Sequence, residues 1–142
     1  MKKQVLVLLT VLTITGTVIA QNVKSTGVPA AVKVALIKKY PGASKATWEK
    51  EKGNFEANWG GKSGEDMSVT FTPQGTFVEQ VGAISPANLP ANVKAYVSAK
   101  FKGAKIKEAG KVTDAKGVIM YEAEVKGKDL VFDENGKFIK LD

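Results

Sequence analysis

Carboxylates are the side chains of this sequence that come nearest to a catalytic arrangement. Glu122 and Glu124 lie two positions apart in a stretch that alternates in polarity, from Tyr121 to Val125. This alternation predicts a strand, whose rise places the two carboxylates about 7 Å apart on one side. Glycosidase pairs operate at such a separation, but the surrounding sequence indicates no cleft, and charged residues are mostly exposed. We therefore interpret the pair as part of a solvated strand face and predict no catalytic residue.

Two other stretches resemble ligand-binding loops only in part. Residues 133–136, Asp-Glu-Asn-Gly, begin like a calcium loop but lack its later glutamate. The same residues are typical of a turn between two strands. Residues 60–64 contain Gly-Lys-Ser, yet the spacing of a phosphate loop and its following helix are missing. We predict that both stretches are hairpin loops, with no metal and no cofactor bound.

The residue types that the chain lacks exclude whole classes of function. The 142 residues include no Cys and no His, and all 21 basic residues are Lys. Acyl-transfer sites built on Cys or His, His-ligated zinc sites and disulfides are therefore excluded. Without Arg there is no guanidinium clamp for phosphate or guanine. The net charge is +7, which suits nucleic acid or an anionic membrane surface, but the Lys residues are interleaved with Glu, which favours a soluble surface over both. We predict that the protein is not an enzyme.

The N-terminal segment, residues 1–20, has the layout of a secretory signal peptide. Lys2 and Lys3 precede an uncharged, mostly apolar run from Val5 to Ala20, which ends in small residues. The run is short for a membrane span. We therefore predict cleavage after Ala20, with an uncleaved membrane anchor as the alternative. The cleaved protein would be periplasmic or secreted and would have no membrane span.

One stretch of the chain occurs twice, 61 residues apart. Residues 28–43 match residues 89–104 without a gap, with the same Pro, Val, Lys and Gly at equivalent positions. In each copy a proline precedes apolar residues at helical spacing, and a glycine follows them, which predicts a short helix. The residues predicted to be buried are Val32, Leu36, Ile37 and Tyr40 in the first helix and Val93, Val97 and Phe101 in the second.

Strand signals follow each predicted helix. Alternating apolar residues bounded by turns predict strands at residues 45–50, 55–59, 67–71 and 76–81, and again at 105–113, 118–126, 129–132 and 137–141. A polar segment, residues 22–27, precedes the first copy. These patterns predict an α+β fold of two tandem helix-plus-four-strand antiparallel repeats, residues 28–83 and 89–142. The repeats would form one open sheet with the two helices packed on one face.

Four motifs, spread over nearly the whole chain after Ala20, form a distinctive combination. They are Tyr40-Pro41-Gly42-Ala43, Trp48-Glu49-Lys50, Tyr121-Glu122-Ala123-Glu124 and the segment from Phe132 to Phe138. Together they resemble the PepSY-like, β-lactamase-inhibitor-like family. The resemblance implies a secreted or periplasmic protein with two helix-plus-sheet units, an open antiparallel sheet and helices on one side.

The open sheet face is the predicted docking surface. We predict a non-enzymatic binding module that inhibits or regulates a secreted or periplasmic enzyme through this face, with no nucleic-acid partner. The alternative is a small-ligand-binding or envelope-stress sensing protein with a pocket between helices and sheet. The residues predicted to face the partner are Glu56, Asn58, Ser68, Thr70, Glu122, Glu124 and Val131.

Overall fold

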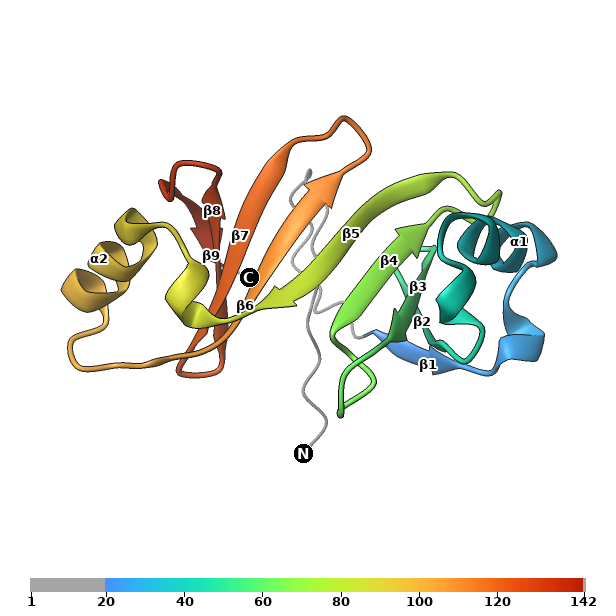
Figure 1. The fold of residues 1–142 in the computed structure, drawn as a ribbon, viewed down its shortest axis with the longest axis horizontal. Coiled ribbons are helices and arrows are strands. Elements are labelled where there is room, and N and C mark those ends of the chain that lie inside the picture. Colours follow the sequence, from blue (N-terminus) through green and yellow to red (C-terminus); the bar gives the residue numbers. More distant parts are fainter. Residues whose placement is uncertain (1–19, 142) are drawn as a thin grey trace. The chain divides into compact units, whose positions relative to one another are not determined.

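The computed structural model of this protein describes residues 20–141, which contain two α-helices and nine strands (Figure 1). The predicted signal peptide lies outside these residues, apart from Ala20, and stays a prediction. The α-helices are α1 (Ala30–Lys39) and α2 (Ala91–Lys100), and the short 3-10 helices are η1 (Ser25–Gly27), η2 (Pro41–Ala43) and η3 (Pro86–Asn88). The strands are β1 (Gln21–Val23), β2 (Thr47–Glu51), β3 (Asn54–Trp59), β4 (Met67–Phe71), β5 (Phe77–Ile84), β6 (Ile106–Asp114), β7 (Ile119–Val125), β8 (Lys128–Asp133) and β9 (Phe138–Leu141).

The nine strands form one open antiparallel sheet in which each strand neighbours the next along the chain. The predicted α+β fold, with two helices and one antiparallel sheet, is confirmed. The chain divides into two compact units, Met1–Gln80 and Val81–Asp142, and each is described below by itself. No helix within residues 20–141 is long and apolar enough to cross a membrane.

β1 is a strand that the alternation pattern did not predict, because it has only three residues. Val23 pairs with Trp48 of β2 and packs against the core, while Gln21 and Asn22 are exposed. A segment this short cannot display a clear alternation of its own. Pairing with β2, and not local pattern, therefore explains why residues 21–23 are extended, and the prediction of eight strands is wrong by one.

The core of the first unit lies between α1 and β2–β4. Val32 and Leu36, four positions apart on the helix, are fully buried against Trp48, Phe55 and other apolar residues. Ile37, predicted to be buried, is instead 41% exposed. It follows Leu36 and so points about 100° around the helix from it, away from the strands.

The end of α1 is held by an aromatic contact and a hydrogen bond. The ring of Tyr40 lies 5.2 Å from that of Trp59, and its hydroxyl donates to Oε1 of Gln80. Burial raises the pKa of the Tyr40 hydroxyl. Tyr40 is therefore half-buried, as part of the predicted apolar stripe, and links the helix to β3 and β5.

The second unit builds its core from α2 and β6–β8. Val93 and Val97 are buried against Ala123, Val125, Leu130 and Phe132. Tyr96 stacks on Phe138 with ring centroids 4.7 Å apart and meets Phe132 edge-on at 5.5 Å. These offset and edge-to-face contacts add to the stability that burial provides. The predicted apolar stripe of the second helix thus packs on the strands that follow it.

Two glycines allow turns of the sheet to approach the helices closely. Gly75, in the turn between β4 and β5, has a φ of +84°, and a Cβ there would lie 2.7 Å from the carbonyl oxygen of Ala31. Gly136, between β8 and β9, has a φ of +78°, and a Cβ there would lie 3.0 Å from Cβ of Asn92. A side chain would collide at the first position and crowd the second, and positive φ also favours glycine. Each turn therefore requires glycine to pack on the first turn of a helix.

Candidate binding face

The strands of the first unit turn a polar face away from the core. In β3, Phe55 and Ala57 enter the core, so that Glu56 and Asn58 lie on the opposite side. The register places Glu56 between Glu49 of β2 and Thr70 of β4. The same register places Asn58 opposite Ser68. The four residues predicted for this face, Glu56, Asn58, Ser68 and Thr70, therefore do lie together on it.

These four residues are predicted to face a partner from an open sheet face, but three of them are buried. Glu56 is 4% exposed, Ser68 3% and Asn58 9%, whereas Thr70 is half-buried. Each buried residue lies on a strand with a neighbour on both sides, and same-face side chains of adjacent strands lie only about 5 Å apart. The neighbouring side chains therefore exclude water from a polar residue in the middle of such a face, even without a helix above it.

Glu56 has the chemistry of a buried acid. Ser68 donates a hydrogen bond from Oγ to Oε1 of Glu56 over 2.5 Å. Burial, assisted by the nearby carboxylates of Glu49, Glu51 and Glu79, raises the pKa of Glu56 to about 8 against the lowering effect of the Ser68 hydrogen bond. At neutral pH this carboxyl therefore holds its proton and contributes no charge to the surface.

In the second unit the corresponding face also buries part of the predicted site. Glu122 is 8% exposed, so the prediction that it lies on a solvated face is wrong, and Val131, predicted to face the partner, is 4% exposed. They lie opposite each other in the register, and Gly110 lies opposite Glu122 on the other side. A Cβ on Gly110 would meet Cγ1 of Val81 at 2.9 Å. The side chain of Val81, in β5, therefore packs over Gly110 beside Glu122, which explains why this carboxylate is shielded from solvent.

Glu124 is the most accessible acid of the predicted site. Its side chain is 19% exposed, and Lys107 approaches it to 3.4 Å. In the register Glu124 lies opposite Glu108 of β6 on one side and opposite Asp129 of β8 on the other. All three are half-buried and lie on the side away from the core residues of their strands. We call Glu108, Glu124 and Asp129 the acidic row.

Two members of the acidic row, Glu108 and Asp129, were not predicted from the sequence. Lys126 and Gly127 form a two-residue hairpin loop, which fixes the pairing of Glu124 with Asp129. This pairing could therefore have been predicted from the sequence. Glu108 is harder to place, because the pairing of β6 with β7 shifts at a bulge between Ile106 and Glu108. A strand pattern without the bulge puts the wrong residue opposite Glu124.

The loops considered as ligand sites are turns, as predicted. In the β8–β9 turn, Oδ1 of Asp133 accepts hydrogen bonds from the backbone N–H groups of Asn135 and Lys137, both at 2.9 Å. The loop at residues 60–64 joins two paired antiparallel strands, β3 and β4. Within residues 20–141, no group of three or more Asp, Glu, His or Cys side chains is arranged to hold a metal ion.

Comparison with known proteins places this geometry in a family. The family model described as "Putative beta-lactamase-inhibitor-like, PepSY-like" matches residues 62–140, which include the acidic row. No curated protein matches the chain. The chain is similar to a solved putative periplasmic protein from Bacteroides eggerthii, with a TM-score of 0.69 and 20% identity over 80% of this chain and 87% of that one. It is also similar to a BLIP-like protein from Bacteroides fragilis, with a TM-score of 0.60 and 21% identity over 80% and 85% of the two chains. At such identities the likeness concerns the fold.

Proposed function

The chain belongs to the β-lactamase-inhibitor-like, PepSY-like family, and from this premise we propose that it is a non-enzymatic protein-binding module that acts in the periplasm or after secretion. The location is supported by the signal-peptide layout of residues 1–20 and by the periplasmic naming of the B. eggerthii protein. A module without His, Cys or Arg is poorly equipped for catalysis. An exposed protein surface is the remaining means of action.

We also propose that the two units are copies of one tandem repeat. Pro29 and Pro90, 61 positions apart, cap their helices with nearly the same backbone angles, φ −54° and ψ 142° against φ −52° and ψ 142°. Gly75 and Gly136 keep the same offset, as do the helix residues that they approach. The predicted repeats, residues 28–83 and 89–142, begin 61 positions apart, in agreement with this offset.

The acidic row is the observation that carries the binding proposal. Glu124 lies directly opposite Glu108 on one side and Asp129 on the other, so that three carboxylates are gathered in register across three strands. Lys107 pairs with Glu124 at 3.4 Å, but an ion pair this close to the surface contributes little to stability. A row of carboxylates at fixed spacing across β6, β7 and β8 suits a partner that presents Lys or Arg side chains.

The buried residues of the predicted site have a different part in this proposal. Glu122 and Val131 are buried on the same face of the sheet, two positions along their strands from Glu124 and Asp129. Glu56, Asn58 and Ser68 are buried within the polar face of the first unit, where Thr70 remains partly accessible. The partner therefore contacts Glu124 directly, and it is a secreted or periplasmic protein, such as an enzyme that the module restrains.

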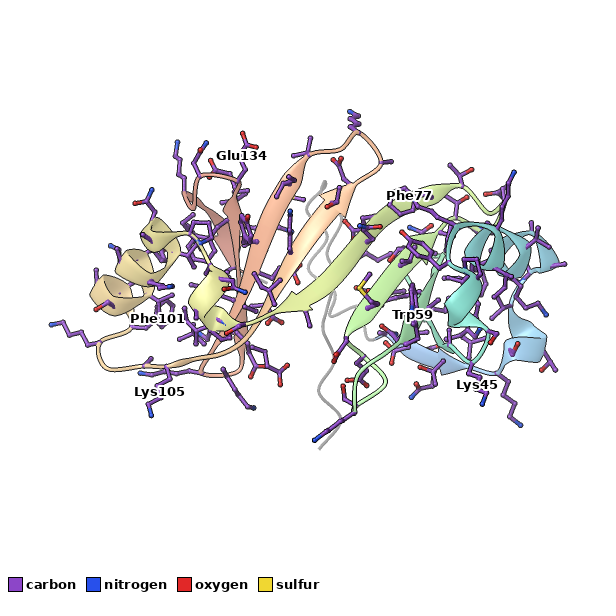
Figure 2. The ribbon with its side chains drawn as sticks, in the orientation of Figure 1. Lys45, Trp59, Phe77, Phe101, Lys105 and Glu134 are labelled. Carbon is purple, nitrogen blue, oxygen red and sulfur yellow. The ribbon has the colours of Figure 1, made fainter. Side chains whose placement is uncertain are left out.

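The proposal is tested by capture from the organism's own envelope and secreted proteins. The chain from Gln21 onward serves as bait, beside a Glu124→Lys variant and a matched Glu134→Lys control. Glu134 is exposed in the β8–β9 turn, so that the control carries the same change of charge outside the acidic row (Figure 2). We expect one partner to be captured by the wild type and the control, and to bind the Glu124→Lys variant at least about tenfold more weakly. Equal capture by all three baits, or none by any, would contradict the proposal.

A further inference from the structure

The outer side of α1 exposes aliphatic side chains to solvent. Val34 is 66% and Ile37 41% exposed, and the two lie three positions apart, on adjacent turns of the helix. Ala30 and Lys38 flank the pair at helical spacing and are also exposed. An exposed Val alone needs no explanation. Two large aliphatic residues that adjoin on one short helix form a surface of their own, which we call the α1 outer face.

The second helix shows that the fold does not require this surface. The positions 61 residues after Val34 and Ile37 are Ala95 and Ser98, both exposed. The buried sides of the two helices are alike, since Val32 corresponds to Val93. The helices therefore share the side that packs on strands and differ in the side that meets solvent. The fold therefore does not require the aliphatic pair of α1.

Every charged residue of α1 and of the segments directly before and after it is a lysine. Residues 20–48 contain five Lys and no Asp or Glu, and the first acidic residue of the whole chain is Glu49. Lys39 lies over the ring of Phe77, 3.4 Å from its centroid, and Lys33 donates to the carbonyl oxygen of Ser25 over 3.2 Å. Phe77 appears beside α1 in Figure 2. Lys38, next to Ile37, is exposed, and so are Lys24 and Lys45 before and after the helix.

We propose that the α1 outer face docks on an anionic phospholipid surface. Val34 and Ile37 enter the boundary between headgroups and acyl chains, and the lysines contact the phosphate groups. A symmetric contact with the α1 outer face of a second copy is unfavourable, because it would bring lysines against lysines. A lipid surface needs no pocket or matching shape from a convex helix, and its charge complements this one. The module then works at a membrane surface, and the acidic row of the other unit is not used for this contact.

Vesicle co-sedimentation tests the proposal with the chain from Gln21 onward. The vesicles are phosphatidylglycerol mixed with phosphatidylethanolamine, and phosphatidylcholine vesicles serve as the neutral reference. We expect the wild type to bind the anionic vesicles, and added salt to release it. The variant Val34→Ala/Ile37→Ser gives α1 the outer residues of α2, and its partition should fall about tenfold. Both side chains are exposed, so the variant should fold normally, which circular dichroism checks.

A matched control distinguishes binding through the α1 outer face from non-specific binding through any exposed apolar side chains. Val118 is 49% and Ile139 48% exposed, both in the second unit, so that Val118→Ala/Ile139→Ser makes the same chemical change elsewhere. This variant should partition like the wild type. The proposal is overturned if the wild type ignores anionic vesicles, binds phosphatidylcholine equally well, or loses binding equally in both variants. In the first case an acidic protein becomes the better occupant of the surface.

Discussion

Replacing Glu56 with Gln should remove a large pH dependence from the stability of the protein. The carboxyl is 4% exposed, accepts a hydrogen bond from Ser68, and has a pKa raised from 4.5 to about 8 by burial and by neighbouring carboxylates. An amide has nearly the same shape and still offers an oxygen to Ser68. The amide cannot ionise, so the difference between the wild type and the variant measures the effect of the Glu56 proton on stability.

The sign and size of the effect follow from proton linkage. Below pH 4.5 both folded and unfolded chains hold the Glu56 proton, and its contribution is fully present. Between pH 4.5 and about 8 the unfolded chain has released that proton and the folded chain has not, so stability falls by about 1.4 kcal/mol per pH unit. Above pH 8 both states are ionised and the loss stops. The total loss is on the order of 5 kcal/mol, comparable with the whole stability of many small domains.

Denaturant unfolding across this pH range measures the prediction. We expect the wild type to lose stability steadily from about pH 4.5 to pH 8, and Glu56→Gln to lose much less. At the alkaline end the variant should be the more stable protein by several kcal/mol. Glu134→Gln, at an exposed turn position, should follow the wild type. Parallel curves for the wild type and Glu56→Gln would refute the reasoning, since the proton on Glu56 would then not couple to folding.

Two further predictions concern glycine and turn geometry. Gly75→Ala should destabilise the first unit by about 2 kcal/mol or more, because the new Cβ would meet the Ala31 carbonyl oxygen at 2.7 Å. Gly53→Ala is the control, because Gly53 has the same φ of +84° but open space around it, and thermal unfolding should show a smaller loss of stability there. Equal losses in the two variants would mean that the contact with the helix has no effect. Lys52 has a φ of +49°, so Lys52→Asn should raise the free energy of unfolding by a few tenths to about 1 kcal/mol, and an unchanged or lower denaturation midpoint would contradict this reading of the turn.

The sequence predicted those parts of the fold that depend on local patterns. The helices follow from apolar spacing and from the flanking Pro and Gly, and the hairpins from their turn residues. What it could not predict depends on contacts between strands. Ile37 extends the apolar stripe in the sequence, but it is 41% exposed, whereas Val32 and Leu36 are buried against the strands.

The candidate site shows the same division. Alternation correctly placed Glu56 and Glu122 on the faces opposite the core. It did not predict that they are buried, because exposure depends on what the adjacent strands carry, such as Gly110 and Val81 beside Glu122. The acidic row required the register of three strands, including the bulge in β6. Local pattern thus predicts the direction of a strand side chain better than its environment.

Carboxylate labelling of the captured complex tests the binding proposal most directly. A carbodiimide with an amine probe modifies accessible carboxyl groups, and mass spectrometry measures the labelling of each residue in the free and bound protein. We predict that labelling of Glu108, Glu124 and Asp129 falls together when the partner binds, while that of Glu134 does not change. Equal labelling of the acidic row in the free and bound states would contradict the account, because the partner would then bind elsewhere.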